Sequence, residues 1–370
     1  MGNKSNSHHH DHDERADSPG HSHDHPHEHS HISHWLPDWL TSRLHVFGHS
    51  HDHRGLASDR AFRENEEGIR TVWIALGILL ATALLQMLIV YFSGSVSLFA
   101  DTAHNIGDGL NSIPLLIAFY LARRIPTRRY TYGFGRAEDV AGIIIVLSIA
   151  VSAVVVLSQS FQRLINPQPL SNLGWVAVAA FLGFLGNEAV AVLQIRVGRR
   201  IGSAAMVADG LHARTDGLTS LAVLFAAAGA WFGFPLIDPI IGIVIGVAIV
   251  FITWDAMKTI WYRLMDAVDP ELIDQAEKVI AKNAGVIETR RVRMRWVGHC
   301  LHADIYISVK PDLTTSDSHQ VAEQVRHALF HDFPDLSDIN VHIDPWTGTE
   351  DTHHKLTSAH EPVPTMIYKE

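Results

Sequence analysis

The chain has 370 residues, of which 47% are hydrophobic and 18% are charged, and its formal net charge is −10 at pH 7. The hydrophobic residues are concentrated between about residues 71 and 262, which is typical of a membrane protein and excludes an ordinary globular one. The acidic balance provides no basic surface for nucleic acid, so no nucleic-acid partner is expected. The single cysteine, Cys300, excludes an internal disulfide framework.

Residues 1–60 are predicted to be a disordered, histidine-rich cytoplasmic tail. Fifteen of the 26 histidines fall between positions 8 and 53, and such a segment has too little apolar surface to fold by itself. Imidazoles at this density bind divalent metals weakly and transiently. The densest run consists of His21, His23, His25, His27 and His29. An expression tag is the alternative, but the irregular mixture with Asp, Glu and Ser argues against it.

Six apolar stretches follow and predict an all-helical transmembrane domain over residues 68–263. Each is long enough to cross a hydrocarbon core about 30 Å thick, and they are 70–92, 95–121, 137–163, 173–197, 203–231 and 236–262. The connections after the second and fourth stretches are rich in arginine, whereas those after the first and fifth contain no cation. The positive-inside rule therefore predicts that both termini are cytoplasmic. We expect an integral protein of the plasma (inner) membrane that contacts lipid.

One eight-residue phrase, D-x-x-H-x-x-x-D, occurs in the second stretch and again in the fifth. Its ionisable residues are Asp101, His104 and Asp108 in the first copy and Asp209, His212 and Asp216 in the second. Residues at i, i+3 and i+7 lie on one face of a helix. A charge at the middle of the bilayer costs about 3 kcal/mol or more. Neither face can therefore point at lipid, and the two faces are predicted to point at each other.

Two imidazoles and two carboxylates from these phrases have the types and number of ligands that suit a tetrahedral Zn²⁺ site. The four predicted ligands are His104, Asp108, His212 and Asp216. Asp101 and Asp209 are predicted to orient the histidines from outside this ligand set. The alternative is that these polar residues only pin helices together, which a repeated motif at helical spacing disfavours. Arg214 points away from the ligand face, either as an anchor or as a partner for Glu188.

Residues 264–348 have the composition of a soluble domain, and residues 349–370 are predicted to be a disordered tail. Pro270–Asn283 and Ser316–Phe330 show the apolar spacing of helices. Three segments alternate between apolar and polar residues as strands do, and they are 291–296, 302–309 and 339–343. The order helix, strand, strand, helix, strand predicts a small α+β domain in which helices cover one face of a sheet.

Longer motifs in the chain resemble those of the cation diffusion facilitator family, over about residues 68–348. They are 95–105 (SVSLFADTAHN), 132–138 (YGFGRAE), 208–216 (ADGLHARTD) and 238–242 (DPIIG). The resemblance implies a homodimer of six-span subunits, each with a ferredoxin-like cytoplasmic domain. It implies export of a divalent metal in exchange for protons through the four intramembrane ligands, with Zn²⁺ preferred and Cd²⁺ or Co²⁺ as further candidates. It also implies a charge pair between Arg136 and Asp266.

The same family binds metal in its cytoplasmic domain, between the two subunits. The candidate ligands here are His319, His342, Asp344 and His302. At two further positions where family members have a metal ligand, this chain has Ile287 and Tyr306. His299 or His302 would then take the place of a missing ligand. Zn²⁺ at this second site would have a structural or regulatory role.

Taken together, these features predict a divalent-metal efflux transporter that works by alternating access. The ligands must lose protons to bind metal, and an unperturbed histidine with a pKa of about 6.5 exchanges its proton near physiological pH. One alternative is a membrane-bound metal sensor or buffer, which explains the tail but leaves the repeated phrase without a use. Another is an intramembrane zinc hydrolase, which needs an open coordination position. The motif H-E-x-x-H does not occur within the six apolar stretches, so no enzymatic activity is predicted.

Overall fold

The computed structural model describes residues 55–93, 107, 109–166, 173–234, 236–348, 354, 356 and 360. Several predictions concern residues outside this set. They include the tail histidines His21, His23, His25, His27 and His29, the first-phrase residues Asp101, His104 and Asp108, and most of the predicted C-terminal tail.

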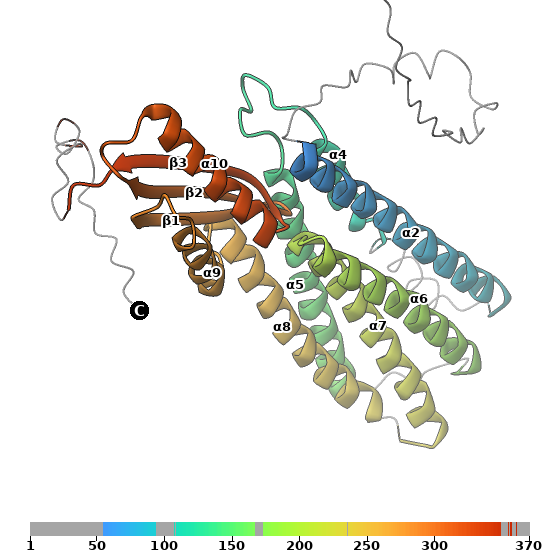
Figure 1. Ribbon diagram of the computed structural model, residues 1–370. Coiled ribbons are helices and arrows are strands. Elements are labelled where there is room, and N and C mark those ends of the chain that lie inside the picture. The colour runs from blue at the N-terminus through green and yellow to red at the C-terminus, as the bar shows by residue number, and fades with distance from the viewer. Residues whose placement is uncertain are drawn as a thin grey trace, which may run out of the picture. The chain divides into compact units, whose positions relative to one another are not determined.

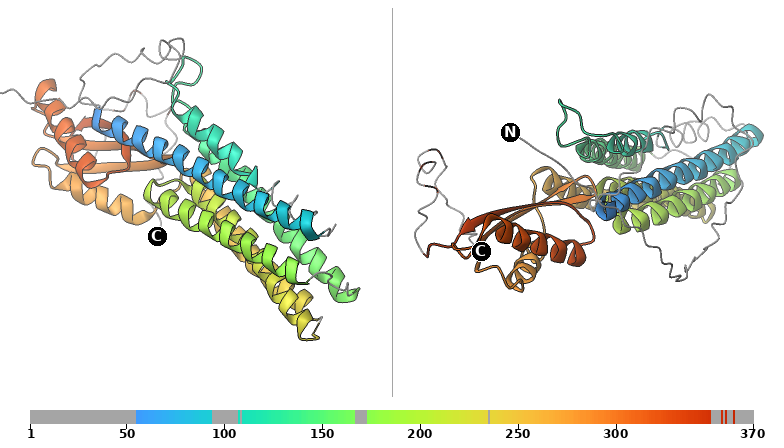
Figure 2. Two further views of the ribbon diagram at one scale, coloured as in Figure 1. Left: turned by 90° about the vertical axis from the view of Figure 1, so that its right-hand side faces the viewer. Right: turned by 45° about the horizontal axis from the view of Figure 1, so that its top comes forward.

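Among the described residues, six helices lie where the sequence predicts the six spans, and they run side by side (Figures 1 and 2). They are α2 (Gly55–Ser93), α4 (Ser112–Ala122), α5 (Arg136–Ile165), α6 (Leu173–Arg200), α7 (Ala204–Trp231) and α8 (Ile237–Leu264). Helix α7 packs against α6, α5 and α8, while α2 packs against α6 and α4. The second copy of the repeated phrase is therefore on a helix that has neighbours on several sides.

Four of the described helices, α2, α5, α6 and α8, are long and apolar enough to cross a membrane. Helix α4 is apolar, but its described part has only 11 residues. Helix α7 has the length of a span, 28 residues. Its apolar sequence is interrupted by Asp209, His212, Arg214 and Asp216. Composition alone therefore does not identify α7 as a membrane span. The polar residues that lower its hydropathy are the same ones that suggest a metal site.

Large apolar side chains on the outside of the bundle indicate which surface meets lipid. Leu84, Val154 and Phe251 are 60%, 67% and 70% exposed, and a soluble protein rarely leaves so many such residues in water. The interior is closely packed, and its fully buried side chains include Leu115, Phe119, Ile145, Ile149, Met206 and Ile249. The exposed apolar surface suits a bilayer.

Helices α6 and α7 form a hairpin with a tight turn at Gly202. The φ angle of Gly202 is 69°, which favours glycine. Ser203 then caps α7, because its hydroxyl accepts a hydrogen bond from the backbone N–H of Met206 at 3.1 Å. Further along, Gly210 lies against α6, and a Cβ there would be 2.9 Å from the backbone nitrogen of Ile195. Glycine at this position allows the two helices to approach closely.

The C-terminal part is an α+β domain with the predicted order of elements. They are α9 (Pro270–Ala281), β1 (Glu288–Val297), β2 (Cys300–Val309), α10 (Thr315–Asp332) and β3 (Leu336–Pro345). The sheet order is β1-β2-β3, with β1 antiparallel and β3 parallel to β2. Helices α9 and α10 pack against each other and against one face of the sheet (Figure 1).

Strand β2 shows how the sequence pattern sets the two faces of this sheet. Leu301, Ala303, Ile305 and Ile307 alternate along the strand and are buried beneath the helices. The alternate residues, such as Tyr306, point to the other face. Polar and aromatic side chains of β2 and β3 therefore meet on the face that α9 and α10 leave open.

Candidate metal transport site

His212 and Asp216 lie one helical turn apart on α7, and the imidazole of His212 is buried. The Nε2 atom of His212 is 3.9 Å from Oδ2 of Asp216. Ligand atoms bound at about 2.1 Å to a tetrahedral Zn²⁺ are roughly 3.4 Å apart. A small rotation of either side chain would bring both atoms to one ion.

Asn111, at the start of α4, contacts the same imidazole. Its Nδ2 atom lies 2.7 Å from Nε2 of His212. The other ring nitrogen, Nδ1, is buried and has no hydrogen-bond partner within the described part of the chain. A buried polar atom without a partner costs about 1–3 kcal/mol, so the burial of Nδ1 is not offset by any hydrogen bond among the described residues.

A small cavity adjoins these side chains. Its volume is about 10 Å³, which is roughly the space that one water molecule or one ion needs. The polar residues that line it include Ser112, Asn187, Gln194, Asp209, His212 and Asp216. Two of these are carboxylates and one is an imidazole, so the lining provides ligand atoms that a divalent cation prefers.

The carboxylate of Asp209 connects three helices. Its Oδ2 atom accepts a hydrogen bond from the Ser112 hydroxyl of α4 at 2.7 Å and another from Nε2 of Gln194 of α6 at 2.6 Å. Asp209 is 3% exposed, so these bonds hold its helix next to α4 and α6. The prediction that Asp209 orients His212 stays a prediction.

Asn111, Ser112 and Gln194 were not among the predicted site residues, although the sequence contains a signal for Asn111 and for Gln194. Asn111 follows Asp108 by three positions, so it lies on the same helical face as the first phrase. Gln194 is one of the few polar residues of a largely apolar span, together with Asn187 and Glu188. The described residues immediately after the first phrase thus contact the second phrase, while His104 and Asp108 themselves lie outside the described residues.

Arg214 points away from this site and pairs with Glu188 of α6. Its guanidinium donates two hydrogen bonds to the carboxylate, at 2.8 Å and 3.3 Å. Of the two alternatives that the sequence leaves open, the structure favours the partner for Glu188.

Arg136 and Asp266 join the beginning of α5 to the segment after α8. The Arg136 guanidinium donates a hydrogen bond to the Asp266 carboxylate and another to the backbone carbonyl of Arg263 at 3.0 Å. Asp266 has a φ angle of 55°, a conformation that aspartate tolerates better than most residues. This pair connects α5 to the segment that leads from α8 into the C-terminal domain.

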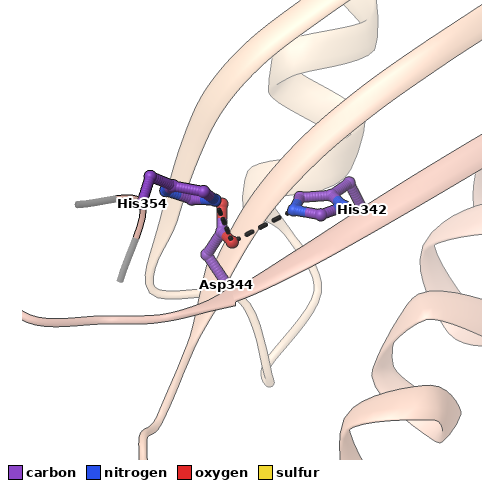
Figure 3. Close-up of side chains that lie close together, drawn as sticks. All are labelled: His342, Asp344 and His354. Carbon is purple, nitrogen blue, oxygen red and sulfur yellow. Dashed lines mark hydrogen bonds and ion pairs between the residues drawn. The ribbon is translucent and has the colours of Figure 1, made fainter. Parts of the chain in front are cut away.

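A second group of side chains that could bind a metal lies on the open face of the C-terminal sheet (Figure 3). His342 and Asp344 are two positions apart on β3, and Nε2 of His342 is 3.1 Å from Oδ1 of Asp344. His354 approaches the same oxygen, with its Nε2 atom 3.5 Å away. These two separations bracket the value of about 3.4 Å expected between ligands of a tetrahedral Zn²⁺. Sequence reasoning missed His354 because it lies beyond the last predicted strand.

His302 and His319 do not belong to this group within the described part of the chain. His302 lies near Asp338, with 3.8 Å between Nδ1 and Oδ2, and this imidazole lowers the pKa of the Asp338 carboxyl. His319 is exposed on α10. Tyr306 is paired with His342 across the parallel strands, and the two rings contact each other at a tilt of 47°, with centroids 5.1 Å apart.

Comparison with known proteins gives a consistent result for both parts of the chain. Residues 72–265 match the family model of the cation efflux transmembrane domain, and residues 268–346 match that of the cation efflux protein cytoplasmic domain. The chain is 50% identical over 297 residues to a probable cation efflux system protein of Mycobacterium tuberculosis, covering 80% of this chain and 89% of that protein. It is 28% identical over 296 residues to the cation-efflux pump FieF of Yersinia pestis, covering 76% and 96%.

The cytoplasmic domain also resembles a solved structure. The C-terminal domain of MamM, in a manganese form, matches 21% of this chain and 98% of that chain, with 23% sequence identity and a TM-score of 0.20.

Proposed function

The chain belongs to the cation efflux family, the cation diffusion facilitators, and we propose that it exports Zn²⁺ from the cytoplasm in exchange for protons. Family membership makes it an integral membrane protein and a cation efflux transporter. The proposal adds the metal, the counter-ion and the residues that bind them. The proposed ligands are His104, Asp108, His212 and Asp216.

The main support is the arrangement around His212. This buried imidazole lies 3.9 Å from the Asp216 carboxylate, beside a cavity the size of one ion. The start of α4 contacts it through Asn111, and α4 directly follows the first copy of the phrase. A second imidazole and a second carboxylate from that copy would complete a four-coordinate site at this position.

Zn²⁺ is the metal that this ligand set favours. Imidazole nitrogen and carboxylate oxygen in a four-coordinate, tetrahedral arrangement are typical of Zn²⁺. Mg²⁺ and Ca²⁺ prefer six or more oxygen ligands. Cd²⁺ and Co²⁺ remain alternative substrates for the same site, because affinity in such sites depends on geometry as well as ligand type.

Protons are the proposed counter-ion because the ligands must be deprotonated to bind metal. When the site opens to the outside, protons on the imidazoles and carboxylates would compete with Zn²⁺ and release it. The protonated site would then return, since it avoids the cost of moving unpaired carboxylates through the bilayer. We propose a homodimer in the inner membrane with both termini cytoplasmic, as the arginine-rich connections predict.

The test is accumulation of ⁶⁵Zn²⁺ in sealed proteoliposomes with and without an imposed proton gradient. Wild-type protein is expected to accumulate the metal when the gradient drives exchange. Asp216→Asn is expected to lower this rate by about a hundredfold, because losing a ligand costs at least as much as losing the partner of a ligand. Asp255→Asn is the matched control, since Asp255 is exposed on α8.

Binding without accumulation in the wild type would instead support the alternative of a membrane-bound sensor or buffer. Accumulation that ignores the proton gradient would remove protons from the proposal but leave metal transport intact. Equal accumulation by wild type and Asp216→Asn would show that the metal takes another route.

We propose further that His342, Asp344 and His354 hold a divalent metal in the cytoplasmic domain. The distances from the two imidazoles to Oδ1 of Asp344 support this, together with the burial of that carboxylate, which is only 6% exposed. His354 would supply a third ligand from the same chain, in a domain where Tyr306 occupies a family ligand position. A metal here would connect the segment that carries His354 to β3.

Metal analysis of the full chain after dialysis checks this second site. His354→Ala is expected to lose about one metal per chain relative to wild type, because a three-ligand site loses most of its affinity with one ligand. The histidine-rich N-terminal tail is present in both samples, so the metal that it binds does not affect the difference in metal content between them. His331→Ala, an exposed histidine of α10, is the control, and an equal loss in that variant would refute the assignment.

A further inference from the structure

The turn between β1 and β2 fits closely against the first turn of α5. Gly298 forms this turn with a φ angle of 62°, a conformation that favours glycine. A Cβ on Gly298 would lie 2.8 Å from the backbone oxygen of Gly135 and 2.9 Å from Oε2 of Glu138. The cytoplasmic domain therefore touches α5 through backbone that has no room for a side chain.

His299, the next residue, forms a buried pair with Glu138. The Nδ1 atom of His299 is 2.9 Å from Oε2 of Glu138, and the two residues are 4% and 1% exposed. Their other polar atoms, Nε2 and Oε1, have no hydrogen-bond partner within the described part of the chain. Each group therefore depends on the other, because removing one partner from a buried pair leaves an uncompensated group.

Arg263, near the end of α8, attaches two further elements to the same turn. Its guanidinium donates one hydrogen bond to the carbonyl of Gly298 and one to that of Gly202, both at 3.1 Å. It also stacks on the Trp296 ring, 4.1 Å from the centroid. Gly202 is in the turn just before α7, the helix that carries His212. The ends of α5, α7 and α8 thus meet at one turn of the cytoplasmic domain.

The titratable groups that act on His299 are Glu138 of α5 and Cys300 of β2. Glu138 also interacts with Asp139 of α5 and Arg263 of α8, and these two interact in turn with Arg136 and with Asp335 before β3. The ring of Phe119 of α4 lies near the imidazole, with its centroid 6.1 Å from that of His299.

We propose that the His299–Glu138 pair is a clamp through which the cytoplasmic domain controls the movement of the transport helices. This inference rests on the proposed transport function. Alternating access requires α7 and its neighbours to change their arrangement, and the clamp fixes the point where α5, α8 and the α6–α7 turn meet. The clamp does not touch the metal ligands. It therefore sets the maximal rate of transport and not the affinity for metal.

Protonation of His299 determines when the clamp is an ion pair. Burial lowers the pKa of His299, but the Cys300 and Glu138 side chains outweigh burial and raise it well above 6.5. The imidazole therefore keeps its proton to a higher pH than an ordinary histidine and loses it as the pH rises through this raised pKa. Alkaline pH on the cytoplasmic side is expected to weaken the clamp and slow transport.

The experiment measures initial Zn²⁺ transport in proteoliposomes against metal concentration and against pH on the cytoplasmic side. The variants are His299→Gln, Glu138→Gln and the double variant, with exposed His327→Gln as the control. Each single variant is expected to lower the maximal rate by about five- to tenfold with the half-saturating metal concentration unchanged. The double variant should be no slower than either single one, because the two residues act as a unit. The alkaline decline in rate should disappear in all three.

Glu138→Gln keeps the shape of the side chain and an acceptor oxygen, so it guards against a folding defect in His299→Gln. Hydrogen exchange of residues 296–301 in the full chain adds a measurement that does not need transport, and both variants should exchange faster there. Unchanged rates and pH profiles, an effect on affinity alone, or an equal effect of His327→Gln would overturn the clamp. A wild type that transports no metal would instead overturn the proposed function.

Discussion

His212 is buried in the bundle with one nitrogen near two polar neighbours and the other without a described partner. The distances from Nε2 to Asn111 and Asp216, 2.7 Å and 3.9 Å, suit a side chain that exchanges a hydrogen bond for a metal bond. A purely structural histidine would be expected to have both nitrogens satisfied. The metal proposed above would bind at Nε2, while Nδ1 has no partner among the described residues.

At the residue scale, the Arg214–Glu188 pair gives a prediction that is separate from metal binding. The two side chains form two hydrogen bonds between α7 and α6 and are each 35% exposed. Arg214→Leu is expected to reduce the thermal stability of the purified protein, with a loss of about 1 kcal/mol, because it leaves the Glu188 carboxylate unpaired. Thermal unfolding in detergent measures this change.

Exchanging the two residues provides the control. The double variant Arg214→Glu, Glu188→Arg restores the opposite charges and should recover most of the lost stability. No recovery would mean that Arg214 acts through packing of its aliphatic stem. The half-saturating Zn²⁺ concentration should stay the same in every variant, since Arg214 points away from the site.

At the scale of elements, the packing of α6 on α7 determines where His212 and Asp216 lie. The two helices approach closely at Gly210, because a Cβ there would be 2.8 Å from Cγ1 of Ile195 and 2.9 Å from its backbone nitrogen. Gly210→Ala is expected to destabilise the protein by about 1–3 kcal/mol, since backbone cannot move aside as a flexible side chain can. It should also weaken transport, because α7 must shift relative to Gln194 of α6.

Gly77→Ala is the matched control for this prediction. A Cβ on Gly77 of α2 meets no atom within 4 Å, so the alanine adds no clash and favours the helix. Thermal unfolding of both variants distinguishes close packing from a general effect of replacing glycine in a helix. Equal stability of Gly210→Ala and Gly77→Ala would show that α6 and α7 are not held as closely as the structure indicates.

The helices and strands could be predicted from the sequence, because the spacing of apolar residues and the length of each apolar segment indicate them. The strands of the cytoplasmic domain were found because Leu301, Ala303, Ile305 and Ile307 alternate with polar residues. Strand β3 is longer than predicted, Leu336–Pro345 in place of 339–343, because pairing with β2 continues past the short apolar alternation. Element ends depend on such partners and not on local sequence.

Contacts between elements could not be predicted in the same way. The approach of Gln194 to Asp209, or of His354 to Asp344, depends on how separate elements pack together. Sequence spacing identified His212 and Asp216 because both lie on one helix. The bond between Glu138 and His299 joins residues 161 positions apart, and no local pattern indicates it.

At the scale of the whole molecule, this bond predicts how stability depends on pH. The folded-state pKa of His299 is raised, so its contribution to stability is fully present below its unfolded-state pKa of about 6.5. The contribution decreases as the pH rises above that value and is lost once the pH passes the raised folded-state pKa. Wild-type protein should therefore be more stable than His299→Gln at pH 6, and the difference should shrink steadily at alkaline pH.

Thermal unfolding of the full chain with chelator present, between pH 6 and pH 9, measures this difference directly. Other groups titrate over the same range, but they are common to both proteins and cancel when the curves are subtracted. Glu138→Gln removes one of the two side chains that raise the pKa of His299, so it should lose part of the pH dependence that His299→Gln loses in full. A difference between wild type and His299→Gln that stays constant over the whole range would mean that the imidazole stabilises the junction by packing against Phe119 and not by its charge.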